Sequence, residues 1–150
     1  MRKIIIILLI FIPFCTMAQM EIKDGIYYTK DKETYTGIYS EYFENGTLKI
    51  KIELKNGKPD GVTILYFKNG DTKEIRSYSR GKMHGKWTTF FGNGKKSAIA
   101  VYQDGKKNGE WKVWDEQGTV RYIMHYKMGE KKDIWKMFDK KGKLINEKKY

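Results

Sequence analysis

From Gly37 onward, glycine recurs at intervals of 24 residues in three separate phases. The first phase holds Gly37, Gly61, Gly85 and Gly109, with Asp133 in the fifth place; the second holds Gly46, Gly70, Gly94, Gly118 and Gly142; the third holds Gly57, Gly81, Gly105 and Gly129. A fixed period of about 20 to 50 residues is the signature of a protein made of stacked, similar units. The sequence therefore predicts five repeats, at 37–60, 61–84, 85–108, 109–132 and 133–150.

Each repeat is predicted to be a β-hairpin. The pair Asn45-Gly46 and its equivalents, Asn69-Gly70 and Asn93-Gly94, suit a two-residue type I′ turn, which requires positive φ at both residues. The connection 56–61 is expected to be longer, and the stretch 49–55, KIKIELK, alternates as a half-buried strand does. No segment has a helical period. The predicted fold is all-β: an elongated, twisted, single-layer antiparallel meander of stacked hairpins.

Counting outward from each turn assigns residues to the two faces of the sheet, because residues that pair across strands share a face. In the fourth repeat Trp111 then faces Met124, while Trp114 lies on the other face with Arg121. A β-bulge would exchange the faces locally. One face is predicted to be rich in aromatic residues, and the candidate partner-binding residues on it are Tyr39, Trp87, Trp111, Trp135, Tyr78, Tyr102 and Tyr126.

The first 18 residues are predicted to be a cleaved secretory signal. Arg2 and Lys3 precede the apolar run 4–14, and Thr16-Met17-Ala18 places small residues before a cut ahead of Gln19. This predicts export to the periplasm or the medium. Lipoprotein anchoring at Cys15 is the weaker alternative, because Phe14 before it is not small. The mature chain then begins with a lead-in hairpin at 19–36.

The chain carries a formal net charge of +12, and removing the signal leaves 28 Lys and Arg against 18 Asp and Glu, or +10. In an exported protein this charge favours anionic lipids, acidic glycans or acidic proteins over nucleic acid. Solubility is the ordinary alternative explanation. A lysine-lined sheet edge is predicted in the connection phase, and its candidate residues for an anionic surface are Lys58, Lys82, Lys106, Lys107, Lys131 and Lys132.

The units follow the form G-x-W-x-x-[YF]-x-x-x-G, then an apolar strand and Y-x-x-G-K-x-x-G. This pattern resembles MORN repeats, specifically the variant in bacterial YwqK-like antitoxins. The resemblance implies a long sheet of stacked hairpins and, for a few members, an antitoxin or immunity-type neutralising role. Thr63 stands where other units have Tyr or Trp, and Asp133 replaces Gly. The last unit is therefore expected to be distorted, as terminal repeats often are.

No catalytic or metal site is expected, and no cofactor. His84 and His125 lie in different repeat phases, and neither has partners at the spacing of a catalytic triad or a metal site. His125 opposite Glu110 is interpreted as a surface cross-strand pair. The Gly-rich turns lack the following helix that a phosphate-binding loop requires. The chain is predicted not to be an enzyme.

Two binding functions remain, next to a purely structural one. The aromatic face is predicted to bind an unidentified protein partner or a second copy of the chain. Its residues are equally consistent with rings that stack from unit to unit and form the core of a one-layer sheet. The alternative function is attachment to anionic lipid or glycan through the lysine edge.

Overall fold

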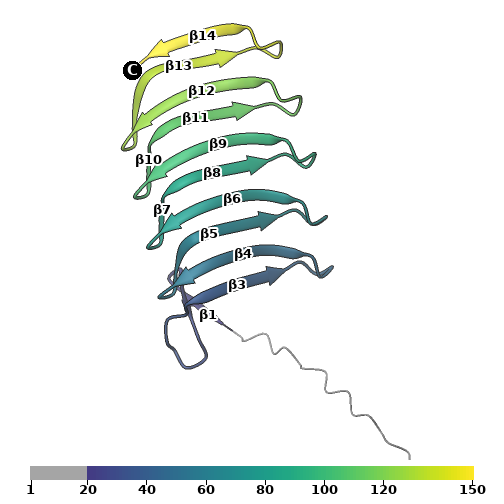
Figure 1. Cartoon of the computed structure of the whole chain (residues 1–150), viewed down its shortest axis with the longest axis vertical. Helices are drawn as coiled ribbons and strands as arrows, with labels where there is room; N and C mark the ends of the chain where they lie inside the picture. Colours follow the sequence, from purple (N-terminus) through teal and green to yellow (C-terminus); the bar gives the residue numbers. More distant parts are fainter. Residues whose placement is uncertain (1–19) are drawn as a thin grey trace, which may run out of the picture.

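The computed structural model describes residues 20–150, so the predicted signal and its cleavage site lie outside the described residues. Within them the protein consists of β-strands without a helix, which confirms the all-β prediction. β1 (Glu21–Lys23) and β2 (Ile26–Tyr28) form a small lead-in hairpin. The remaining strands form one antiparallel sheet in which successive hairpins stack along the long axis (Figure 1).

The large sheet follows the chain order with only two side branches. Its ten-strand path runs through β3 (Gly37–Tyr42), β4 (Leu48–Lys55), β5 (Lys58–Tyr66), β6 (Thr72–Ser79), β8 (Gly85–Phe90), β9 (Lys96–Gln103), β11 (Gly109–Trp114), β12 (Val120–Lys127), β13 (Glu130–Phe138) and β14 (Leu144–Lys149). The short strands β7 (Lys82–Met83) and β10 (Lys106–Lys107) pair with β6 and β9. Every pairing is between strands close in sequence, as expected of a meander.

The two kinds of turn are the reverse of the prediction. The two-residue type I′ turns are the connections between repeats: Lys55 pairs with Lys58, and the intervening Asn56 and Gly57 have φ of 50° and 73°. The same geometry recurs at Arg80-Gly81, Asp104-Gly105 and Met128-Gly129. These turns lie along the left side of Figure 1. The predicted longer connection is therefore wrong, because the strand resumes directly after the first of its two glycines.

At the other end of each hairpin, on the right in Figure 1, the loop has three residues instead of two. Phe43 N–H donates to the Thr47 carbonyl and Gly46 N–H to the Phe43 carbonyl, while Asn45 does not have positive φ. This is a type I turn followed by a glycine at φ 79°. Asn45 is needed here for its side chain, since its Oδ1 accepts a hydrogen bond from Thr47 N–H at 3.1 Å. In the fourth and fifth repeats Asp115 and Asp139 provide the corresponding acceptor.

A β-bulge follows this loop in all five hairpins. In the fourth, Val113 pairs with Tyr122 but Trp114 pairs with Val120, so Arg121 is the extra residue. The predicted pairing of Trp114 with Arg121 is therefore wrong. The bulge lies beyond the residues that define the aromatic face, and the predicted partners Trp111 and Met124 are opposite each other. We call the side of the sheet that carries them the ladder face.

The last repeat is not distorted where it was expected to be. Asp133 adopts a positive φ of 58°, and the glycines at this position in the other repeats also have positive φ, between 77° and 146°. Aspartate tolerates this region better than most residues. Its carbonyl accepts a hydrogen bond from Tyr150 N–H at 2.9 Å, which ties the chain's final residue to β13.

Few side chains are buried in this one-layer sheet. Among residues 20–150 only Gly57 and three residues with side chains, Ile52, Leu54 and Thr63, are buried, and these three have 4 or 5% of their surface exposed. All three lie on the ladder face near β1 and β2. No helix in the described part of the chain is long and apolar enough to cross a membrane.

Candidate functional site

Seven aromatic rings stack in an unbroken row along the ladder face, one from each of β6, β8, β9, β11, β12 and β13 and the last from Tyr150, directly after β14. Neighbouring ring centroids are 4.8 to 5.6 Å apart, with tilted or edge-to-face geometry. This spacing lies in the range where aromatic pairs attract beyond simple burial. The rings are Tyr78, Trp87, Tyr102, Trp111, Tyr126, Trp135 and Tyr150.

The tryptophans of this row also form hydrogen bonds with the backbone. The indole N–H of Trp111 donates to the Val101 carbonyl at 3.0 Å, and Trp87 and Trp135 make the same bond to Ser77 and His125. In each case the acceptor is ten residues earlier. Stacked on both sides and hydrogen-bonded, these indoles have a structural role that would exist without any partner.

The row is interrupted between the first and second repeats, where Leu54 of the first and Thr63 of the second replace the rings. Here the lead-in hairpin covers the ladder face. The Tyr27 ring packs on Tyr39 at 5.0 Å, and Tyr27 N–H donates to the Gly57 carbonyl at 2.9 Å. Ile26 lies so close that a Cβ added to Gly57 would be 2.6 Å from its methyl group. The lead-in hairpin is thus what buries Leu54 and Thr63.

Charges on this covered part of the ladder face are neutralised within the chain. Tyr39 donates a hydrogen bond to Glu41 at 2.8 Å, and Lys49 forms a salt bridge with Glu41 at 3.2 Å. Burial and the hydrogen bond to Glu41 raise the pKa of Tyr39 to about 12, while the bonds from Tyr39 and Lys49 lower that of Glu41. In the next repeat Arg76 pairs with Glu74 and lies 5.0 Å from the Trp87 ring.

The ladder face beyond β8 carries lysines instead. Lys107 Nζ lies 4.6 Å from the Trp111 ring and 4.9 Å from that of Tyr126. Lys131 Nζ lies 4.7 and 4.6 Å from Trp135 and Tyr150, and Lys148 Nζ 5.1 Å from Tyr150. Cations at such distances are attracted to the ring faces. None of the three forms a salt bridge within residues 20–150.

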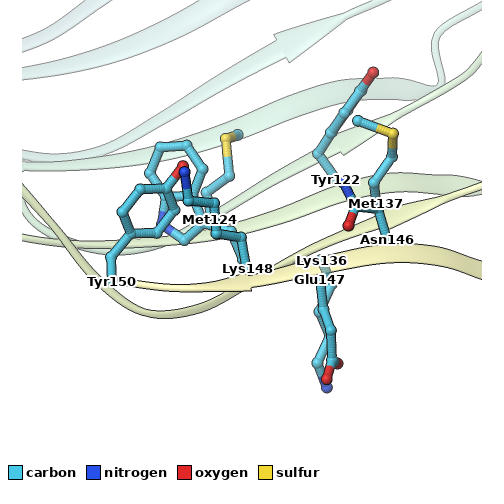
Figure 2. A pocket seen from close by; sticks show the side chains of 9 residues that line it. Tyr122, Met124, Lys136, Met137, Asn146, Glu147, Lys148 and Tyr150 are labelled. Carbon is cyan, nitrogen blue, oxygen red and sulfur yellow. The ribbon is translucent and has the colours of Figure 1, made fainter.

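The same region contains an open apolar groove of about 300 Å³. Met124 and Tyr122 from β12, Met137 from β13 and Tyr150 line it, while Lys148 stands among them (Figure 2). Tyr122 and Tyr150 are 38 and 40% exposed. Figure 2 also shows the side chains of Lys136 and Glu147 extending to the other side of the strands. We call this the C-terminal groove.

The six lysines predicted to line one edge lie beside the type I′ turns but on two faces. Lys107 and Lys131 pair with Tyr102 and Tyr126, which places them on the ladder face. On the opposite face Lys58, Lys82 and Lys106 each follow a turn glycine directly, and Lys132 pairs with His125. Alternation of side chains along a strand separates the two sets.

The two histidines each approach one carboxylate. His84 Nδ1 lies 3.5 Å from Asp104, and His125 Nε2 lies 3.6 Å from Glu110, the predicted cross-strand pair. Residues 20–150 contain no group of three or more His, Cys, Asp or Glu side chains able to hold a metal ion. Neither His–carboxylate pair therefore belongs to a metal-binding group within the described residues.

Comparison with known families agrees with this repeat geometry. Three segments match the MORN repeat variant. They are residues 35–56, 83–104 and 107–128, which start 48 and 24 residues apart and so keep the 24-residue phase. The two stretches left between and after them in that phase contain Thr63 and Asp133, the positions that depart from the repeat pattern. No curated protein matches the chain.

MORN repeats are generally thought to mediate protein or membrane interactions, and the family is generally non-catalytic. Sequence reasoning assigned Met124 to the ladder face but did not predict the C-terminal groove. It also missed that the lead-in hairpin covers the other end of this face. The positions of the acidic residues could have indicated that the two ends of this face differ, because Glu41 and Glu74 fall on the ladder face early in the chain.

Proposed function

We propose that the protein is a non-catalytic scaffold that binds a protein partner through the C-terminal groove of its ladder face. The supporting observation is the unequal cover of that face. The lead-in hairpin covers Leu54 and Thr63, whereas Met124, Met137 and Tyr122 form an open apolar groove. Apolar grooves with a few polar groups at the rim are typical sites for partner side chains.

Site-specific cross-linking tests this proposal. A photo-reactive amino acid placed at Met137 in the groove should cross-link a partner protein, whereas the same group at the adjacent Lys136 on the other side should not. Adding Tyr122→Asp to the Met137 probe should abolish the product, because a charge would then lie in the apolar groove. Equal products from both probe positions, or none from either, would contradict the proposal.

A second candidate function is attachment to anionic lipid or glycan surfaces. It is favoured by Lys58, Lys82 and Lys106, which occupy the same position after successive type I′ turns. One strand lies between each lysine and the next, so two strand spacings place their backbones about 10 Å apart. Binding to phosphatidylserine vesicles should weaken as salt is raised and should be lost when all three become Met.

The cellular setting is part of the proposal. Export after cleavage before Gln19 would place the scaffold in the periplasm or outside the cell, and amino-terminal sequencing of the protein recovered there tests it. An antitoxin or immunity-type role is a narrower form of the same scaffold. It requires that the bound partner be a toxin whose activity falls when the groove is occupied.

A further inference from the structure

The two ends of the ladder face differ in charge as well as in cover. Up to β6, each ladder-face carboxylate, Glu41 or Glu74, is paired with a cation. From β8 onward, the strand positions that share a face with the aromatic row hold Lys107, Lys131 and Lys148. No carboxylate in residues 20–150 pairs with these three. An acidic group of a ligand would supply the opposite charge for these three lysines.

The lysines are held where a ligand in the groove would meet them. Lys131 lies over both Trp135 and Tyr150, and its Nζ is 3.4 Å from the Tyr150 hydroxyl. Lys148 lies over Tyr150 from the strand that forms one side of the groove. A ring face satisfies only one side of an ammonium group, which has three donors. Both amines therefore keep donors for an anion beside the apolar groove.

The protein's own lead-in hairpin is an example of how a peptide covers the ladder face. It adds one extended segment, with Ile26 against Gly57 and Tyr27 against the Tyr39 ring. Two backbone hydrogen bonds join the lead-in segment to Gly57: Tyr27 N–H donates to the Gly57 carbonyl, and Gly57 N–H donates to the Tyr35 carbonyl. An extended segment with large apolar side chains therefore has suitable chemistry for this face, and the groove at the other end offers the same kind of surface without such a segment.

We infer that the C-terminal groove takes an extended acidic peptide of a partner protein, with an aromatic or branched apolar side chain against Met124 and Met137 and a carboxylate on Lys131 and Lys148. This inference rests on the proposed scaffold function and specifies its ligand. A flat membrane surface fits less well, because the apolar side chains line a recess. The apolar contact would supply most of the affinity and the lysines the selection for acidic sequences.

The test uses the mature chain and a defined probe: an acetylated, amidated eight-residue peptide that alternates glutamate with isoleucine or tyrosine. Fluorescence anisotropy should show saturable binding that weakens with salt. The same peptide with lysine for glutamate should bind at least tenfold more weakly. The double variant Lys131→Met, Lys148→Met should lose tenfold or more in affinity, because methionine keeps the apolar chain and removes the charge.

The matched control is Lys51→Met, Lys86→Met, which removes two charges from the opposite face and should leave the affinity within twofold. Circular dichroism confirms that both variants fold. Absence of peptide binding, equal binding of the lysine peptide, or equal loss in both variants would overturn the inference. If cross-linking from Met137 persists in any of these cases, the scaffold function stands and only the acidic ligand is wrong.

Two other occupants give distinct results. Binding to phosphatidylserine vesicles that depends on Lys131 and Lys148, without peptide binding, would assign the groove to a membrane. A dimer in sedimentation velocity that the same double variant dissociates, again without peptide binding, would assign it to a second copy of the chain. Either result would overturn the peptide inference.

Discussion

The two ends of the ladder face reach similar backbone geometry by different means. Near β4 and β5, small aliphatic and polar side chains are buried because the lead-in hairpin lies over them. From β6 to β14, large rings stack from strand to strand and leave part of each ring in solvent. A one-layer sheet can therefore be stabilised either by a cover or by an aromatic row. Only the second solution leaves a face available to a partner.

The largest expected effect is at the covered end. Leu54→Ala should destabilise the protein by about 2 to 4 kcal/mol, because it leaves a cavity beneath the lead-in hairpin. The matched change Met124→Ala in the open groove should cost about 1 kcal/mol, since solvent already reaches that site. Urea denaturation followed by circular dichroism measures both. Equal losses would show that the lead-in hairpin does not create a distinct core.

Two glycines at the same position of type I′ turns sharpen the comparison. A Cβ at Gly57 would be 2.6 Å from Ile26 and 2.8 Å from the Tyr27 carbonyl, whereas one at Gly105 would meet nothing within 4 Å. Both have positive φ, so Gly105→Ala should cost about 1 kcal/mol from backbone strain alone. Gly57→Ala should cost about 1 to 2 kcal/mol more by displacing the lead-in hairpin. Hydrogen exchange at β2 should increase only in Gly57→Ala.

A smaller effect is expected within the aromatic row. Trp111→Phe keeps a ring in place but removes the hydrogen bond to the Val101 carbonyl, which should cost about 1 kcal/mol. That carbonyl also accepts Asn108 N–H at 2.9 Å, which keeps the loss moderate. Trp114→Phe on the opposite face is the control, because its indole makes no hydrogen bond within residues 20–150. Thermal unfolding should rank Trp111→Phe below Trp114→Phe, and the reverse order would refute the backbone role.

The smallest effect concerns pH. Tyr39 has a folded pKa of about 12 against an ordinary value of 10.0, so the folded state retains its proton longer than the unfolded chain. Its contribution to stability is therefore complete below pH 10 and is lost between pH 10 and about 12. Absorbance titration at alkaline pH should detect several late-titrating tyrosines, because burial also raises the pKa of Tyr27 and Tyr102, and this late absorbance change should be smaller by one tyrosine in Tyr39→Phe. Titration of Tyr39 near its ordinary value would argue against the contact with Glu41.

The repeat architecture could be predicted from the sequence. The 24-residue glycine period defined the hairpins, and alternation placed Trp87, Trp111 and Trp135 on one face with their tyrosines. It assigned the turn types in reverse, because Asn-Gly serves equally in a three-residue loop where the asparagine side chain accepts a hydrogen bond. Periodicity identifies which residues turn the chain but not how many residues each loop contains.

The difference between the two ends of the ladder face depends on contacts between segments that the repeat pattern does not relate. The lead-in hairpin lies outside the repeat period, so no phase argument could place Tyr27 over Tyr39 or bury Leu54. Neighbouring lysines such as Lys106 and Lys107 have the same charge in the sequence. The structure distinguishes them, because Lys107 lies over the rings of Trp111 and Tyr126 whereas Lys106 lies on the opposite face. Side-chain packing across strands, which a one-dimensional pattern does not contain, sets that difference.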